Sequence, residues 1–291
     1  MSQLNDLNSR FPANSHWHFS EPAPGIVLLH IHSDTSTATI SLYGGQVLSF
    51  RPRNQDDLLW VSDDAHFAEG KAIRGGIPVC WPWFGPHPTD ADAPAHGTVR
   101  KTPWQLEELE CNHQHAKVLL RYSDENLNLQ LAITLDTRLH LALTTENHGA
   151  TNATITSALH SYFAISDISD IHITGLEDKP FRDAVNSNRA CLQRGVIRFN
   201  GELDRVYQDV DKAICIHDPG LKRIIRIHNT GSKSAVVWTP WIDKSKRLGD
   251  MGVNGYRQMV CVESANADSD AITLPPGGQH TLSALLSIED L

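Results

Sequence analysis

Leu127-Asn-Leu-Gln-Leu-Ala-Ile-Thr-Leu135 alternates apolar and polar residues over its whole length. Side chains along a strand point in turn to the two faces of a sheet, so this alternation predicts a strand that is buried on one face only. The run from Arg138 to Thr145 follows after two residues and predicts a second strand.

Strand-like runs recur along the whole chain, and turn residues such as Asn147-His-Gly149 and Asp218-Pro-Gly220 separate them. The further runs are Gly25 to His32, Thr37 to Tyr43, Lys117 to Tyr122, Ala153 to Leu159, Ala213 to His217, Lys222 to His228, Ala235 to Thr239 and Thr281 to Ser287. Amphipathic helical patterns are scarce, and only Lys244 to Asp250 predicts a short helix. Because strands and helices do not alternate, we predict an all-β fold, a large antiparallel β-sandwich.

The length of the chain and the lack of a linker-like segment favour a single domain. The chain has 291 residues, and β-sandwiches and barrels of about 200–250 residues fold as one domain. No linker-like break divides the chain, so we predict one domain over residues 1–291. The stretches 74–96 and 177–207 interrupt the succession of predicted strands, and we expect them to be long functional loops.

Composition and charge exclude several kinds of partner. The net charge is −9 and the Lys and Arg residues are scattered, so no basic face for nucleic acid is expected. The first ten residues are polar and no apolar run reaches membrane-spanning length, from which we expect no membrane partner and a cytoplasmic protein. Five widely spaced cysteines, with Cys261 inside an apolar run, are expected to be reduced thiols.

The least regular stretch is Arg74-Gly-Gly-Ile-Pro-Val-Cys-Trp-Pro-Trp-Phe-Gly-Pro86, where prolines and glycines nearly exclude regular structure. Arg74 offers a rigid fork of donors to an oxyanion. Trp81, Trp83 and Phe84 offer flat faces to the C–H groups of a sugar. The alternative is a loop that its aromatic side chains anchor onto the sandwich.

Two further motifs carry polar side chains suited to sugar binding. In His96-Gly-Thr-Val-Arg100 a glycine turn lets a histidine and an arginine converge, although a histidine beside glycine is also common in plain turns. In Leu203-Asp-Arg-Val-Tyr207 the carboxylate of Asp204 is available to sugar hydroxyls, or else pairs with Arg205 or caps a turn.

Two titratable residues occur within apolar strand-like stretches, His160 in Ser157 to Ala164 and Glu263 in Gln258 to Asn266. A histidine on a rigid strand has a pKa suited to a general acid. A glutamate that ends an apolar strand gains a raised pKa by desolvation, which suits a general base. The alternatives are a buried histidine satisfied by one hydrogen bond and a carboxylate that is solvated or paired with an arginine.

The 16 histidines raise the question of a metal site. Three closely spaced pairs are His16 and His18, His30 and His32, and His113 and His115. No paired cysteines and no His-Glu-x-x-His motif supply further zinc ligands, so we expect no metal site. The chain also lacks the Gly-x-Ser-x-Gly elbow of many hydrolases and the P-loop of nucleotide-binding enzymes.

Five motifs follow one another in a fixed order. They are Arg74-Gly-Gly-Ile-Pro with Trp-Pro-Trp-Phe-Gly, His96-Gly-Thr-Val-Arg100, Leu159-His-Ser-Tyr-Phe163, Leu203-Asp-Arg-Val-Tyr207 and Val262-Glu-Ser-Ala-Asn266. Together they resemble the glucose-6-phosphate 1-epimerase family, of the galactose mutarotase-like superfamily, across most of the chain. The resemblance implies a single large β-sandwich. One position departs, since Ala95 precedes the motif histidine where some relatives carry glutamine.

The resemblance also implies an activity, the interconversion of the α and β anomers of hexose 6-phosphates, glucose 6-phosphate among them. No metal or redox cofactor is implied, because proton transfer alone opens the sugar ring. The implied partner is a small sugar phosphate, and we separately expect the protein to be a monomer. The implied roles are general base for Glu263, general acid for His160, sugar binding for His96 and Asp204, and contact with the substrate or its phosphate for Arg74 and Arg100.

Two alternatives to this activity stay open. An aldose 1-epimerase for free hexoses would use the same chemistry without gripping a phosphate, although Arg74 and Arg100 favour the phosphosugar because arginine forks match phosphate geometry. A non-catalytic carbohydrate-binding sandwich would bind on its aromatic side chains and would not need both His160 and Glu263. The preferred hexose phosphate is equally open, because it depends on the hydroxyl contacts in the pocket.

Overall fold

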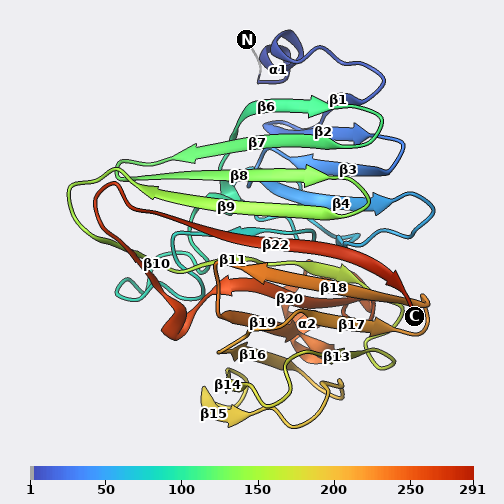
Figure 1. The fold of residues 1–291 in the computed structure, drawn as a ribbon, viewed down its shortest axis with the longest axis vertical. Helices are drawn as coiled ribbons and strands as arrows, with labels where there is room; N and C mark the ends of the chain where they lie inside the picture. Colours follow the sequence, from blue (N-terminus) through green and yellow to red (C-terminus); the bar gives the residue numbers. More distant parts are fainter. Residues whose placement is uncertain (1–2) are drawn as a thin grey trace.

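The computed structural model describes residues 3–291, and antiparallel strand ladders make up most of it (Figure 1). One eight-stranded sheet has the order β13 (His172–Thr174), β17 (Ile214–Asp218), β18 (Arg223–Thr230), β22 (Gln279–Asp290), β9 (Leu139–Asn147), β8 (Leu127–Leu135), β7 (Ala116–Ser123) and β6 (Gln105–Cys111). The second has the order β15 (Arg189–Leu192), β14 (Pro180–Asp183), β16 (Leu203–Tyr207), β19 (Ser234–Thr239), β20 (Met259–Asn266), β11 (Ser157–Leu159) and β5 (Val79–Cys80), with β12 (Tyr162–Ala164) also paired to β20.

Two smaller sheets complete the fold. The four-stranded sheet has the order β1 (Trp17–Ala23), β2 (Ile26–His32), β3 (Ser36–Ser41) and β4 (Gln46–Pro52), and β10 (Ala153–Ile155) pairs with β21 (Ile272–Leu274). In Figure 1, β1 to β4 overlap the half of the first sheet that contains β6 to β9. Strands β11, β20, β19 and β16 of the second sheet overlap the other half, which contains β22, β18 and β17. The predicted antiparallel β-sandwich is confirmed.

The alternation in Leu127–Leu135 produces β8 with the bounds that the sequence predicted. Leu129, Leu131 and Ile133 are buried, whereas Gln130 and Ala132 point away from the core. One continuous cluster of buried apolar side chains extends from Leu7 to Leu286 and receives residues from both eight-stranded sheets and from the four-stranded sheet. The sheets are therefore layers around a shared core.

The helices differ from the sequence prediction. The helix expected at Lys244 to Asp250 is α2 (Trp241–Leu248), which begins three residues earlier and ends in the left-handed Gly249. A second helix, α1 (Gln3–Arg10), was not expected, because it has only two turns and buries only Leu7. Short 3-10 helices are η1 (Val99–Lys101), η2 (Gly255–Gln258) and η3 (Asp268–Asp270).

One of the two expected loops is wrong. Residues 177–207 contain β14, β15 and β16, which form one end of the second eight-stranded sheet. Their strands are short and carry outward-facing arginines such as Arg182 and Arg189, so the apolar alternation is weak there. The run Ala153 to Leu159 also divides into β10 and β11, which belong to different sheets.

The stretch 74–96 is irregular apart from the two residues of β5, as predicted. It passes closely between neighbouring segments: a Cβ on Gly75, whose φ is 116°, would lie 2.4 Å from the carbonyl oxygen of Trp60. All five cysteines are free thiols, and Cys261 is buried, both as expected. Within residues 3–291, no helix has the length and apolar character to cross a membrane.

Candidate active site

Strand register brings His160 and Glu263 together. Leu159 of β11 is paired with Ser264 of β20, and Tyr162 of β12 is paired with Cys261. The register is the same on both sides of the break between β11 and β12, so His160 lies directly opposite Glu263. His160 Nε2 is 3.3 Å from Glu263 Oε1.

The stretch after Arg74 contacts the residues at this break from the side opposite β20. The backbone N–H of His160 donates to the carbonyl of Pro78, and that of Tyr162 donates to the carbonyl of Gly76. The irregular stretch after Arg74 therefore lies along these residues and places its own side chains beside the histidine. Glu263 itself is in the middle of β20, which corrects the prediction that it ends a strand.

Burial dominates the electrostatics of this pair. Glu263 is 2% exposed and His160 is 9% exposed. Burial raises the pKa of Glu263 well above its usual range, and the nearby charge of Asp204 raises it further. Burial also lowers the pKa of His160 well below its usual range, with His96 and Arg100 acting in the same direction. Burial therefore favours the neutral forms of both groups.

His96 reaches the pair from a strained turn. Its φ is 65°, and a Cβ on the following Gly97 would lie 1.9 Å from the carbonyl oxygen of Trp81. The backbone N–H of Gly85 donates to His96 Nδ1 over 3.3 Å, so in the neutral ring the hydrogen is on Nε2. Burial, with Arg100 and Arg74, lowers the pKa of His96 to about 3. His96 is thus a neutral donor, with its ring 5.7 Å from that of His160.

A pocket of about 350 Å³ opens beside His160. Arg74 and Arg100 line it together with Lys71 and Lys101, whereas Asp250 is the one carboxylate among the lining residues. In a chain with a net charge of −9, this concentration of positive charge favours an anionic ligand. The two lysines were missed in the sequence, although each lies within three residues of a motif arginine.

The two arginines are held differently. Arg74 Nε donates to Asp250 Oδ1 over 3.1 Å, and its NH1 donates to the hydroxyl of Tyr162 over 3.0 Å. Arg100 donates through NH2 to the carbonyl of Ala95 over 2.7 Å, while its Nε is buried without a hydrogen-bond partner. Arg100 therefore keeps an unused donor inside the pocket wall.

Asp204 lies on β16, two strands away from Glu263 on the same face of the sheet. Burial raises the pKa of Asp204, and Lys244 partly offsets this effect. Lys244 Nζ is 3.8 Å from Asp204 Oδ2. The alternative pairing with Arg205 is wrong, because Arg205 approaches Asp183 and Gln193 instead.

The aromatic side chains of the 74–86 stretch do not form one platform. Trp81 is fully buried and donates to Thr145 Oγ1, so it anchors the loop in the core. Trp83 donates to the carbonyl of Pro94, and Phe84 packs edge to face on His96. The rings that do approach the acid/base pair are those of Tyr162 and Trp238, which lie 4.9 and 6.1 Å from His160.

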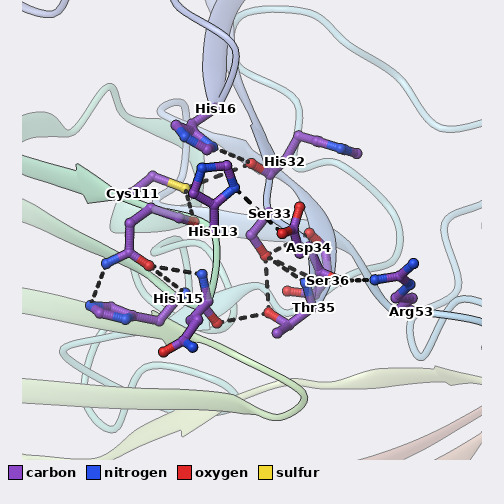
Figure 2. Close-up of polar contacts among 12 residues, drawn as sticks. His16, His32, Ser33, Asp34, Thr35, Ser36, Arg53, Cys111, His113 and His115 are labelled. Carbon is purple, nitrogen blue, oxygen red and sulfur yellow. Dashed lines mark hydrogen bonds and ion pairs between the residues drawn. The ribbon is translucent and has the colours of Figure 1, made fainter.

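Four of the closely spaced histidines, His16, His32, His113 and His115, lie in a separate group of polar contacts (Figure 2). His16 Nδ1 contacts the carbonyl of His32, and His113 Nδ1 lies 3.4 Å from Asp34 Oδ2. Cys111 Sγ also approaches the carbonyl of His32, at 3.8 Å. Across residues 3–291, no three His, Cys, Asp or Glu side chains are grouped so that they could hold a metal ion.

Comparison with known proteins gives consistent results. The model of the aldose 1-epimerase family matches residues 27–287. A protein of Escherichia coli strain K12 named "Putative glucose-6-phosphate 1-epimerase" is 36% identical over 241 residues, which cover 79% of this chain and 80% of that protein. A protein of Cenchrus ciliaris with the same name is 35% identical over 273 residues, covering 86% of this chain and 82% of that protein.

Solved structures share the fold. A crystal structure described as that of a putative mutarotase from Salmonella typhimurium aligns with a TM-score of 0.90 at 27% identity, over 98% of this chain and all of that one. Galactose 1-epimerase from Lactobacillus acidophilus aligns with a TM-score of 0.73 at 14% identity, over 94% and 98% of the two chains. The second similarity is one of fold alone.

Proposed function

Because the chain belongs to the aldose 1-epimerase family, we propose that it interconverts the α and β anomers of a hexose 6-phosphate by acid/base opening of the sugar ring. The observation that carries this proposal is the 3.3 Å contact between His160 Nε2 and Glu263 Oε1. The anomeric oxygen and the ring oxygen of a hexose are both bonded to C1. An acid and a base that serve these two oxygens must lie side by side, as this pair does.

In the proposed mechanism, Glu263 accepts the proton of the anomeric hydroxyl while His160 donates a proton to the ring oxygen. The bond between C1 and the ring oxygen breaks, and C1 becomes the carbonyl carbon of the open-chain aldehyde. Rotation about C1–C2 then presents the other face of the carbonyl. Ring closure returns both protons to their donors. Each positioned acid or base typically contributes about 10²–10⁴-fold to such a rate.

In the proposed active state, His160 and Glu263 hold one titratable proton between them. Burial raises the pKa of Glu263 and lowers that of His160, and both shifts favour this proton on Glu263. Transfer across the 3.3 Å contact produces the carboxylate and the imidazolium that ring opening uses. Because the two groups interact so closely, the pH dependence of the reaction belongs to the pair rather than to either residue.

Two polar groups near the acid/base pair are suited to hold the sugar, although neither is among the residues that line the pocket of about 350 Å³. His96 presents its Nε2–H as a donor that stays neutral, since its pKa is about 3. Asp204, on the far side of Glu263, presents carboxylate oxygens to hydroxyl groups. We therefore retain both as sugar contacts, one as a donor and the other as an acceptor.

The phosphate is assigned to the basic side of the pocket. Lys71, Arg100 and Lys101 line it, and Arg100 Nε has no hydrogen-bond partner in the protein. Charge-assisted hydrogen bonds to a phosphate dianion would satisfy that donor and neutralise the excess of positive charge. Arg74 contributes less to the phosphate, because Asp250 and Tyr162 already occupy two of its nitrogens.

The proposal extends to the oligomeric state of the protein and to the compartment in which it is active. We propose that the protein is active as a monomer. Five free cysteines suit a reducing compartment such as the cytoplasm. Light scattering of the active protein tests the first point: a mass above that of the 32.3 kDa chain would contradict it.

Saturation-transfer NMR on equilibrated sugar tests the proposed reaction directly. The protein should accelerate exchange between the anomeric protons of α- and β-glucose 6-phosphate, and free glucose should exchange more slowly. Galactose 6-phosphate and mannose 6-phosphate, assayed in parallel, rank the hexoses. Faster exchange of free glucose would contradict the phosphate assignment. Binding without accelerated exchange of any sugar would leave a carbohydrate-binding sandwich.

A further inference from the structure

The imidazole of His160 is oriented without the usual hydrogen bond. A histidine that moves protons is commonly fixed by a bond from its second ring nitrogen to a carbonyl or carboxylate. Here Nε2 contacts Glu263, but Nδ1 is buried and has no hydrogen-bond partner in another residue. Contacts between rings must therefore set the plane of this imidazole.

The closest of these contacts is with Tyr162. The two rings are stacked with their centroids 4.9 Å apart and their planes 11° from parallel. Trp238 and His96 approach His160 edge-on, at 6.1 and 5.7 Å. Among the ring contacts of His160 within residues 3–291, the one with Tyr162 is stacked, so we take this contact as the one that fixes the tilt of the imidazole.

Tyr162 is itself fixed at both ends of its side chain. Its hydroxyl accepts a hydrogen bond from Arg74 NH1, and Arg74 Nε is held in turn by Asp250. Its ring also stacks with that of Trp60, at 6.0 Å and 23°. The side chain is 2% exposed. A ring held in this way cannot rotate away from the imidazole that it covers.

We propose that Tyr162 is a positioning residue for His160, which holds the plane of the imidazole and stabilises its protonated form through the face of the phenol ring. The electron-rich face of an aromatic ring attracts a cation, most strongly where water is excluded. This attraction opposes the desolvation that disfavours the imidazolium. The inference rests on the proposed role of His160 as the general acid.

Two substitutions separate positioning from simple packing. Tyr162→Phe keeps the ring and removes the hydroxyl that Arg74 contacts, whereas Tyr162→Leu removes the ring but keeps an apolar side chain. We expect kcat to fall by about 10- to 100-fold in the leucine variant, because a reacting group that is misplaced by about 1 Å can lose that much. The phenylalanine variant keeps the stacked ring but loses the hydroxyl contact with Arg74, so its kcat should fall clearly less than that of the leucine variant.

The pH dependence provides a readout that packing alone would not move. Loss of the phenol ring disfavours the imidazolium form of His160. When His160 and Glu263 hold two titratable protons between them, His160 is always in this form. The acid limb of the kcat profile should therefore move to lower pH in Tyr162→Leu, by about half a unit to one unit, and stay in place in Tyr162→Phe. Two-bond ¹H–¹⁵N spectra report the protonation of His160 without any turnover, and should show the same shift.

The outcomes distinguish this inference from the proposed function. Full activity of His160→Ala would overturn the acid role and this inference with it. An inactive His160→Ala together with a leucine variant of unchanged kcat and unchanged acid limb would overturn the inference alone. Equal losses in the leucine and phenylalanine variants with no shift of the limb would assign Tyr162 to packing, which also overturns it. Thermal unfolding of both variants identifies any loss that comes from misfolding.

Discussion

Replacing Arg100 by glutamine tests how the pocket distinguishes a sugar phosphate from a free sugar. Arg100 Nε is buried without a partner, and NH2 is already used by the carbonyl of Ala95. Under the proposed assignment of the phosphate, the variant removes one charge-assisted hydrogen bond that a free sugar does not accept. Such a bond contributes about 1.5–3 kcal/mol, which corresponds to a loss of about 10- to 150-fold in kcat/KM.

The effect on the acid/base pair must be separated from the effect on binding. The charge of Arg100 lowers the pKa of both His160 and Glu263, so its removal alters the chemical step as well. That change affects glucose 6-phosphate and glucose alike. The ratio of their kcat/KM values, measured by NMR exchange at one pH, isolates the phosphate contact and should fall by about 10- to 150-fold.

A matched variant provides the control. Arg121→Gln removes an arginine that pairs with Glu107 on the first eight-stranded sheet, and it should leave the ratio unchanged. Arg100→Lys keeps the charge but not the planar fork, so it should recover part of the loss. Equal losses on glucose and glucose 6-phosphate in Arg100→Gln would refute the assignment of the phosphate to this side of the pocket.

Three further predictions concern pH and stability. Because burial lowers the pKa of His160, the acid limb of kcat/KM should lie below the ordinary histidine value of about 6.5, and a limb above it would contradict the burial argument. Glu263→Gln should raise the melting temperature, because a carboxyl whose pKa is raised in the folded state destabilises the protein as pH rises above its unfolded pKa of about 4.3. The gain in melting temperature should therefore be larger at about pH 8 than at about pH 5. A gain that becomes smaller as pH rises would refute this prediction. Leu131→Ala should destabilise the protein by about 2–5 kcal/mol in urea unfolding, because Leu131 is buried in the core. Gln130→Ala, on the outward face of β8, should cost about 0.5 kcal/mol or less. Equal effects would contradict the burial of alternate residues in β8.

The strands were predictable wherever one face is buried and the other is solvated. Leu127–Leu135 meets this condition over its whole length, and its bounds were correct. The prediction fails where the physical condition fails. The strands β14 and β15 lie at the end of a sheet, where half of their residues face solvent and the apolar alternation disappears. The single domain over residues 1–291 stays a prediction, which the shared core supports.

The end of β20 shows a different reason for an incorrect boundary. The sequence suggested that the strand ends at Glu263, because the polar residues Ser264 and Asn266 follow. Both are buried, since Ser264 donates to Asn229 Oδ1 and Asn266 donates to the carbonyl of Gly231. Polar residues continue a buried strand when distant partners satisfy them, and such partners are not visible in the local pattern.

The sequence motifs identified the six candidate site residues, but they did not identify the residues that contact them in the folded protein. Arg74, Arg100 and His160 line one pocket, with Glu263 in contact with the histidine. Asp250 was missed because it meets Arg74 only through the fold, across 176 positions of sequence. Which side chains complete a site depends on long-range packing, whereas a motif records only what is close along the chain.

The most direct test of the acid/base pair is the anomer exchange rate of glucose 6-phosphate in Glu263→Gln. Glutamine keeps the shape of the side chain but cannot accept the hydroxyl proton, so saturation transfer should show exchange no faster than in buffer, while the variant stays folded and still binds the sugar phosphate. Exchange at the rate of the unmodified protein would contradict the assignment of Glu263 as the base and, with it, the mechanism.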